Sequence, residues 1–361
     1  MLKQEKVLIA ALDWGLGHAT RMFPIIEYFL DNNYEVALAS SSNALILFKT
    51  RYNNLKCFEL PAYNIHYSSN SMVMNMIAQL PKIKNAISDE KRKLDIILKE
   101  FAANLIISDN RYGIYHKNIP SVFITHQLQI LPPKIMKATK PLLKVLHSEM
   151  MSNFKQVWIP DFKGDNSLAG ELSQVSNPSR NIFYIGALSR FINHKIVNTR
   201  KINEFPTILV LLSGPEPARS NFEEIVLEQL SEYKGKSVVL KGLPNDDNKI
   251  ILNNITIYNH LNDNELLEVI KFSDLIVSRS GYSTIMDLYF LGMKAVFVPT
   301  PGQTEQEYLA NKFYRESKFF CQKQDEFDVD KIISNYKLYS GFNSEESIYK
   351  NEISKALKQL I

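Results

Sequence analysis

The stretch from Leu275 to Ala310 constrains the fold most, because it contains two apolar strands joined by a helix. The strands are predicted at Leu275 to Ser278 and at Ala295 to Val298, with a helix from about Ser283 between them and another helix start after a Pro/Gly loop. This order predicts a βαβ unit in an open parallel sheet. In such a sheet ligands bind at the carboxyl ends of the strands, where helix N-termini present free N–H groups that suit a phosphate.

The turn after the first of these strands has the residues of an anion site. Ser280, Gly281, Ser283 and Thr284 are small and let an anion approach the backbone. Asp287 lies four residues after Ser283, hence on the same helix face. A phosphate and a hydroxyl-binding carboxylate side by side predict a nucleotide site. The alternative is an ordinary βαβ unit with a Ser-capped helix.

A second glycine-containing turn follows the first strand of the chain, Lys6 to Leu12. Gly15 and Gly17 permit close backbone approach, and the residues after them have helical periodicity. Strand, glycine loop and helix form a generic anion-binding arrangement. His18 is expected between the second glycine and the helix, with its imidazole in the crevice, and Arg21 follows it. This histidine is what indicates a chemical role for the loop.

Two further strands of the first half end in polar residues. Asn104 to Ser108 leads to Asp109 and Arg111, and Pro120 to Thr125 leads to His126. Both strands are expected to deliver these residues to the edge of the sheet where the glycine loop lies. Asp109 acts as a general base or orients the loop histidine; alternatively, it caps the loop by accepting backbone N–H bonds, which Asp commonly does.

In the second half, the strand Thr207 to Leu212 ends at Ser213 and Gly214, and a helix starts just beyond. This arrangement again suits an anion, and Arg219 adds a charge and a fork of donors. We therefore predict that Ser213, Gly214 and Arg219 contact phosphates. Further along the chain, Asp263 is expected to be the N-cap of the next helix.

These segments resemble glycosyltransferase family 28, a family of GT-B glycosyltransferases. SRSGYSTIMDL followed by PTPGQTEQEYLA looks like the family's donor-binding signature, SGPEPARSNFE resembles its second phosphate loop, and GLGHATR resembles its acceptor-side glycine loop. The resemblance implies that the Ser-Gly helix start holds the donor pyrophosphate. It also implies that Asp287 stands where the family has a ribose-binding Glu.

The resemblance implies a donor site in the second half and an acceptor side in the first. Together with the contacts predicted above, the donor-binding residues are Arg190, Ser213, Gly214, Arg219, His260, Leu261, Ser280, Gly281, Ser283, Thr284, Asp287, Gln303, Glu305 and Gln306. The acceptor-side residues are Gly15, Gly17, Arg21, Arg111 and His126. Within the donor set, the family's pattern implies that Arg190 reaches the pyrophosphate, that His260 and Leu261 lie against the base, and that the glutamines contact the sugar.

Length and composition set outer bounds. The 361 residues suffice for two domains, and 45% hydrophobic content indicates a globular protein. A formal charge of +4 is too weak to indicate nucleic acid. Cys57 and Cys321 have no metal-ligand spacing, and so few cysteines fit a reduced, cytosolic protein. The first apolar run is far shorter than the ~20 residues that span a bilayer. No GxSxG, HExxH or Walker motif occurs, which excludes the common hydrolase, protease and P-loop classes.

We predict an α/β protein of the GT-B fold, with two doubly wound, Rossmann-like domains facing a central crevice. The expected parts are an N-terminal acceptor domain at 1–192, a linker at 193–205, a C-terminal donor domain at 206–342 and a final helix at 343–361 that crosses back onto the first domain.

The family resemblance implies an inverting glycosyltransferase. The expected donor is a nucleotide sugar, UDP-linked and carrying an N-acetylhexosamine or a hexose, and the expected acceptor is a hydroxyl group, open to being lipid-linked. His18 is the first candidate for the base because its pKa lies near working pH, with Asp109 second. Helix N-termini with Arg190 or Arg219 would stabilise the leaving diphosphate, so no metal or other cofactor is expected.

Two other functions stay open: a nucleotide-sugar hydrolase or epimerase on the same fold, and a non-catalytic nucleotide-sugar binding protein. The segment Leu128 to Met151 carries lysines at helical spacing. It is either a peripheral contact with the inner face of the membrane, for a protein expected in the cytoplasm, or a solvated basic face. Ala62 to Asn70 is expected to be a loop over the crevice, without a readable code for the acceptor.

Overall fold

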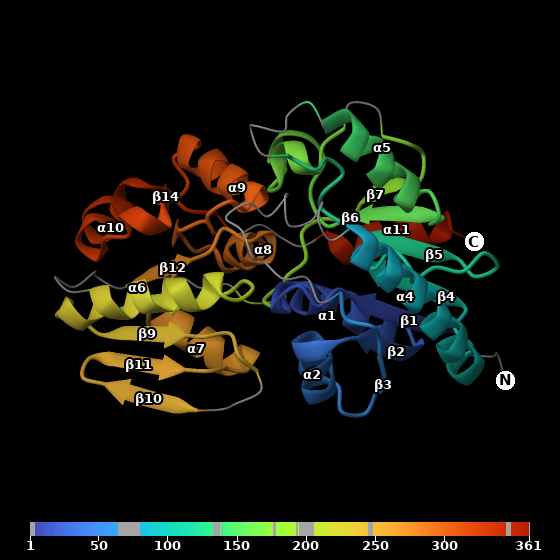
Figure 1. Ribbon diagram of the computed structural model, residues 1–361, viewed down its shortest axis with the longest axis horizontal. Coiled ribbons are helices and arrows are strands. Elements are labelled where there is room, and N and C mark those ends of the chain that lie inside the picture. Colours follow the sequence, from blue (N-terminus) through green and yellow to red (C-terminus); the bar gives the residue numbers. More distant parts are fainter. Residues whose placement is uncertain are drawn as a thin grey trace. The chain divides into compact units, whose positions relative to one another are not determined.

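The computed structural model describes residues 4–63, 80–132, 138, 140–175, 178–192, 194, 206–244, 248–343 and 348–360 of the chain. The chain forms two compact units (Figure 1). Unit 1 comprises the chain up to Ser189 together with the C-terminal helix, and unit 2 begins at Arg190. Most of the linker expected at 193–205 and most of the loop expected at 62–70 lie outside the described residues.

Unit 1 is built on a seven-stranded parallel sheet in the order β3-β2-β1-β4-β5-β6-β7. Residues 7–11 of β1, an interior strand, are all buried, the pattern of a parallel sheet covered on both faces. The strand order reverses between β1 and β4, and at such a switch point open α/β sheets bind their ligands. The strands are β1 (Lys6–Ala11), β2 (Glu35–Ser40), β3 (Lys56–Glu59), β4 (Leu105–Asp109), β5 (Ser121–Ile124), β6 (Gln156–Ile159) and β7 (Ile182–Tyr184).

The C-terminal helix packs on unit 1. The side-chain amide of Gln156 in β6 donates to the carbonyl of Ala356 at 2.8 Å, and Ile353 of the same helix is fully buried. The end of the chain therefore completes the unit that its start forms. The helices of unit 1 are α1 (Leu16–Asp31), α2 (Ser42–Arg51), α4 (Leu80–Phe101), α5 (Lys140–Met151) and α11 (Tyr349–Lys358), with the short 3₁₀ helices η2 (Gly164–Asn166) and η3 (Gly170–Leu172).

Unit 2 repeats the doubly wound plan. Its seven-stranded sheet has the order β10-β11-β9-β8-β12-β13-β14, parallel except for the antiparallel edge strand β10, and its order reverses between β8 and β12. The strands are β8 (Ile208–Leu211), β9 (Ser237–Leu240), β10 (Lys249–Leu252), β11 (Ile255–Tyr258), β12 (Leu275–Ser278), β13 (Ala295–Phe297) and β14 (Phe320–Cys321). The helices are α6 (Ala218–Glu232), α7 (Asp263–Phe272), α8 (Tyr282–Leu291), α9 (Thr304–Arg315) and α10 (Val329–Asn335), with η4 (Gln324–Glu326) and η5 (Tyr336–Leu338).

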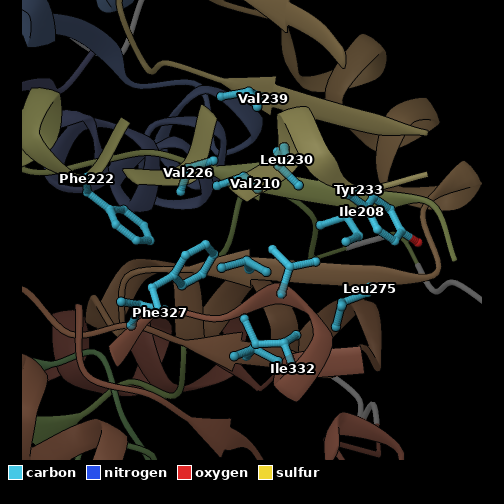
Figure 2. Close-up of a cluster of buried hydrophobic side chains, with 14 of the residues drawn as sticks. Ile208, Val210, Phe222, Val226, Leu230, Tyr233, Val239, Leu275, Phe327 and Ile332 are labelled. Carbon is cyan, nitrogen blue, oxygen red and sulfur yellow. The ribbon is translucent and has the colours of Figure 1, made fainter. Parts of the chain in front are cut away.

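A hydrophobic core lies under α6 and α10 of unit 2 (Figure 2). Phe222, Val226 and Leu230 recur every four residues on α6, so they form one buried stripe of the helix. The ring of Phe222 meets the ring of Phe327 edge-on, with 5.4 Å between their centroids. Each such side chain stabilises the fold by about 1.5–3 kcal/mol through burial. This core fixes the start of α6 against the sheet, and with it the loop that leaves β8.

Two local expectations differ from the structure. Helix α7 is capped by Asn262 and not by Asp263: the Asn262 carboxamide oxygen accepts the N–H of Glu265 at 3.0 Å, and the Glu265 carboxylate accepts the N–H of Asn262 at 2.9 Å. This reciprocal capping box satisfies two N–H groups at once, which is why it prevails. His18 lies within the first turn of α1, because the helix already begins at Leu16.

Candidate active site

The switch point of unit 1 brings His18 and Asp109 together. His18 lies in the first turn of α1, which follows β1, and Asp109 is the last residue of β4. The Nδ1 atom of His18 is 3.1 Å from Oδ2 of Asp109, which is completely buried, whereas the His18 side chain keeps 19% of its surface exposed. The buried carboxylate thus sits behind an imidazole that is accessible to a ligand.

Arg21, one turn further along α1, completes this cluster. Its Nε donates to Oδ2 of Asp109 at 2.9 Å, and one of its terminal nitrogens donates to the other carboxylate oxygen. A second terminal nitrogen lies 3.2 Å from Nδ1 of His126, which follows β5 and is 6% exposed. Arg21 and His126, predicted to face an acceptor, are therefore buried members of the network that holds the His18–Asp109 pair.

The charges of the cluster set the protonation of His18. Burial by itself would raise the pKa of Asp109, but the adjacent Arg21 and His18 hold that pKa down, at about 2. Burial and the charge of Arg21 lower the pKa of His18, against the opposing effect of Asp109. His18 is therefore neutral at pH 7. Nδ1 faces both the Asp109 carboxylate, at 3.1 Å, and a terminal nitrogen of Arg21, at 3.0 Å. In the tautomer that carries its proton on Nδ1, this proton is donated to the carboxylate and Nε2 can accept a proton.

Arg111 has a structural role that sequence reasoning did not anticipate. It is fully buried, and its guanidinium donates to the carbonyls of Ala11 at 2.9 Å and Pro61 at 2.7 Å and to the carboxylate of Glu90 at 3.1 Å. Glu90 is itself completely buried. The prediction that Arg111 faces an acceptor is thus not supported by its position, because its donors tie the end of β1 to α4.

The backbone conformation of Gly15 explains why the first loop has a glycine at this position. It is the N-cap of α1, with φ +100°, a conformation that other residues rarely adopt, and nothing lies within 4 Å of where a Cβ would be. Gly17 lies one residue before His18, and its carbonyl accepts from the Thr20 hydroxyl at 3.2 Å. The turn therefore leaves open space beside the first turn of α1.

The switch point of unit 2 places two glycines at the ends of β8 and β12. Gly214 has φ +110°, and Gly281 is the N-cap of α8. Among the described residues no carbonyl or side chain accepts the N–H of either glycine. Gly214 is exposed, as is Ser213 before it. The N–H of Gly281 lies at a helix start, the place that suits an anion, as predicted for this edge, and Ser283 and Thr284 lie in the first turn of the same helix α8.

Ser280 and Gln306 form hydrogen bonds within the protein. The Ser280 hydroxyl is buried and donates to the carbonyl of Gln306 at 2.8 Å, while the Gln306 carboxamide oxygen accepts the N–H of Thr300 at 2.8 Å. Their side chains hold the loop between β13 and α9 against the start of α8. Gln303, the N-cap of α9, differs: its buried Oε1 has no hydrogen-bond partner in the described part of the chain. Glu305 lies in the first turn of the same helix.

Arg190 joins two helices of unit 2. It donates to the carboxylate of Asp263 in α7 at 3.1 Å and to that of Asp287 in α8 at 3.3 Å. Asp287, expected to bind a ribose, is 15% exposed and lies one turn into α8. His260 and Leu261 lie between β11 and α7, with Leu261 buried. A ribose or phosphate beside Asp287 would therefore contact an Arg190 side chain that already binds two carboxylates.

Arg219 is the predicted phosphate contact that the structure favours least. Its guanidinium donates to Glu216 and Glu223, both at 2.6 Å, and Lys241 also binds Glu223 at 2.6 Å. Two carboxylates therefore neutralise the two cations. Among the described residues the N–H of Gly214 has no acceptor, so it is a better phosphate ligand here than this side chain.

Arg279 is a buried cation that sequence reasoning missed. It is completely buried and donates to the carbonyls of Val298, Pro299 and Ala218 and to the side chain of Gln324. No carboxylate of the described chain pairs with it. The sequence did contain a sign of its role. Arg279 directly follows an apolar strand and precedes the Ser-Gly helix start, and a charged residue is unusual at the end of a buried strand.

Within the residues that the structure describes, no group of three His, Cys, Asp or Glu side chains gathers to hold a metal ion.

Comparison with known proteins supports the family predicted from the sequence. Residues 220–360 match the family model for the glycosyltransferase family 28 C-terminal domain. The chain is 28% identical over 183 residues to the UDP-N-acetylglucosamine--N-acetylmuramyl-(pentapeptide) pyrophosphoryl-undecaprenol N-acetylglucosamine transferase of Rickettsia bellii, a match that covers 45% of this chain and 51% of that protein. It thus spans about half the length of the curated peptidoglycan relatives that it matches.

Two further comparisons extend over most of the chain. An uncharacterized glycosyltransferase of Methanosarcina acetivorans is 22% identical over 319 residues, which is 84% of this chain and 81% of that protein. The crystal structure of MurG from Acinetobacter baumannii is similar with a TM-score of 0.56 at 11% identity, covering 98% of this chain and 99% of that chain. At this identity the likeness shows the fold, and the predicted GT-B fold with two Rossmann-like domains is confirmed.

Proposed function

We propose that this chain, a GT-B protein whose second half carries a glycosyltransferase family 28 C-terminal domain, transfers a sugar from a nucleotide-sugar donor to a hydroxyl acceptor. The observation that carries the proposal is the pair of His18 and the buried Asp109 at the switch point of unit 1. An accessible neutral imidazole held by a carboxylate is a general base. Unit 2 supplies the complementary part, two glycine N–H groups suited to a diphosphate.

In the proposed reaction Nε2 of His18 takes the proton of the acceptor hydroxyl while the hydroxyl oxygen attacks the anomeric carbon of the sugar. The bond from that carbon to the diphosphate breaks, and one displacement inverts the configuration. Negative charge develops on the departing diphosphate. The N-terminus of α8, the unpaired N–H groups of Gly214 and Gly281 and the positive charge of Arg279 stabilise it. Asp109 stabilises the imidazolium that forms on His18, so it is a positioning residue.

We propose that the donor is UDP-linked and that no metal takes part. The UDP-sugar is supported by the names of the relatives that match the second half. Reaction without a metal is supported by the helix start at Gly281 and the buried Arg279, which together offer positive charge to a leaving diphosphate. The sugar is an N-acetylhexosamine or a hexose.

A lipid-linked acceptor is the finer part of the proposal, with the protein in the cytoplasm and in peripheral contact with the membrane. No described helix is long and apolar enough to cross a membrane. On α5, Val145 is 63% and Leu146 44% exposed, and Lys144 precedes them, a combination that suits a surface of anionic lipid. Lys134 and Lys137 of the predicted contact segment lie outside the described residues.

The test is turnover of UDP-sugars by the purified protein, followed as UDP release with and without a lipid-linked or soluble acceptor and with EDTA. His18→Ala should lower kcat by roughly 10²- to 10⁴-fold and leave donor affinity unchanged, because the base acts only on the acceptor proton. His116→Ala is the matched control, since this half-exposed histidine lies in the β4–β5 connection outside the cluster.

The outcomes separate the candidate functions. Acceptor-dependent UDP release with a glycosylated product supports transfer. UDP release at the same rate in water alone identifies a hydrolase, and an epimerised sugar identifies an epimerase. Donor binding without any turnover identifies a binding protein. Unchanged turnover in His18→Ala would remove the proposed base, and loss of activity in EDTA would overturn the metal-independent reaction.

A further inference from the structure

Thr300 carries a buried hydroxyl without a partner at the edge of unit 2 where the anion site lies. The residue follows β13 in the loop that leads to α9, and it is 8% exposed. Among the residues that the structure describes, its Oγ1 has no hydrogen-bond partner. Buried hydroxyl groups are nearly always hydrogen-bonded, because leaving one unpaired costs about 1–3 kcal/mol. An unpaired hydroxyl at this place therefore calls for a ligand.

The backbone of Thr300 is fixed, so its side chain is held in place. Its N–H donates to the Gln306 carboxamide oxygen at 2.8 Å, and its carbonyl accepts the N–H of Gln303 at 3.1 Å. The hydroxyl faces Gly214 at the end of β8: a Cβ built on Gly214 would have the Thr300 oxygen as its one neighbour within 4 Å, at 4.0 Å. The missing side chain leaves space between the two residues.

The groups around this space favour an anion. Within the described part of the chain the N–H groups of Gly214 and Gly281 have no acceptor, and α8 begins after Gly281. The buried Arg279 donates to the carbonyls of Val298 and Pro299, the two residues before Thr300. A cation therefore binds the loop that carries the hydroxyl, and donors without acceptors lie at the neighbouring strand ends; a hydroxyl in such a setting serves as a donor itself.

We propose that the Thr300 hydroxyl donates a hydrogen bond to a non-bridging oxygen of the donor's diphosphate. This inference rests on the proposed function and deepens it, since it names a binding residue that neither the sequence motifs nor the family match assigns. The second unpaired atom of the loop, Oε1 of Gln303, can only accept a hydrogen bond, so it suits a hydroxyl and not a phosphate. The two residues thus have different ligand chemistry.

The test replaces Thr300 by Val, which keeps the shape and removes the hydroxyl, and by Ser, which keeps the hydroxyl. Affinities of the full chain for UDP, UMP and uridine are measured by titration calorimetry. Thr300→Val should weaken UDP binding roughly tenfold or more, the size expected for a hydrogen bond to a charged group, and leave uridine binding unchanged. Thr300→Ser should bind UDP within about threefold of the wild type.

Thermal unfolding without ligand separates a binding role from a structural one. Since the hydroxyl has no partner in the protein, Thr300→Val should have a Tm equal to or above that of the wild type. If the hydroxyl had a structural role, Thr300→Val would have a lower Tm than the wild type and Thr300→Ser would recover the wild-type Tm. That result would overturn the inference.

The failures of the two proposals are distinguishable. If UDP binds the wild type and Thr300→Val equally well, the Thr300 contact is wrong while the donor site stands. If neither UDP nor the other nucleoside diphosphates GDP, dTDP and CDP bind the wild type, the proposed function falls and the Thr300 contact falls with it. Equal loss of UDP and uridine binding in Thr300→Val also contradicts a phosphate contact.

Discussion

The two units share the doubly wound plan, and their switch points differ in the partners of a buried arginine. In unit 1, Arg21 binds Asp109 through both carboxylate oxygens, so charge is balanced beside His18. In unit 2, Arg279 is equally buried but its partners are carbonyl oxygens and the side chain of Gln324. A neutral site suits a base acting on a neutral hydroxyl, whereas an unbalanced cation suits a diphosphate. Fold alone does not set this chemistry; the pairing of a few side chains does.

The largest expected effect comes from breaking the balanced pair. Asp109→Asn leaves Arg21 buried without a counter-charge, which should cost about 3–5 kcal/mol in the free energy of unfolding. It should also lower kcat, because the imidazolium on His18 loses the carboxylate that stabilises it. Urea unfolding and steady-state kinetics measure the two effects. Removing one partner of a buried ion pair costs at least about 3 kcal/mol. A loss below about 1 kcal/mol in the free energy of unfolding would therefore contradict the coupling between Arg21 and Asp109 that their contacts indicate.

The unbalanced arginine should respond in the opposite way. Arg279→Met removes a charge that burial disfavours, as its pKa of about 10 indicates, and keeps an apolar stem over the ring of Phe222. Its carbonyl partners lose bonds but no charge is left unpaired, so the stability loss should be about 1–3 kcal/mol, smaller than in Asp109→Asn.

Arg279→Met should weaken the binding of UDP roughly tenfold more than the binding of uridine, because only UDP carries the anion that the charge attracts. Titration of both ligands at two salt concentrations measures this. Arg315→Met, on the exposed end of α9, is the matched control for a surface arginine. Equal weakening of UDP and uridine would mean that Arg279 acts by shaping the loops and not by its charge.

The smallest expected effect is a displacement of the pH profile. The pKa of His18 is lowered by burial and by Arg21 from its ordinary 6.5, so the imidazole stays neutral further into acid. The decline of turnover with falling pH, as His18 becomes protonated in the folded protein, should therefore have its midpoint below pH 6.5. Rates from pH 5 to 8 test this, with donor affinity measured alongside. A decline that begins above pH 7 would contradict the neutral state assigned to His18.

Local sequence was sufficient to predict which residues lie at the binding edges. Gly15, Gly214 and Gly281 follow apolar runs and precede periodic ones, and each does lie between a strand and a helix. The expectation that His18 and Asp109 meet also followed from strand ends, because parallel strands present the same end at one edge of a sheet. Their contact at 3.1 Å spans 91 positions of sequence.

The roles of the arginines were harder to predict. Arg111, Arg190 and Arg219 were all expected to face a ligand, and each donates to a carboxylate of its own unit. Thr300 and Arg279 were not anticipated. A residue type shows that a side chain can donate, but which acceptor it finds depends on residues that the fold brings near.

The sequence by itself determined the class of fold and the positions of the glycine turns, because these follow from local periodicity and from residues that permit particular backbone conformations. The tertiary structure alone decided which charges are neutralised and which polar atoms are left unpaired. Arg21 is neutralised by Asp109, and Arg279 has the uncharged side chain of Gln324 as a partner. In both cases the partner lies dozens of positions away in the sequence. Electrostatic interaction falls with distance in space, and sequence separation does not report that distance.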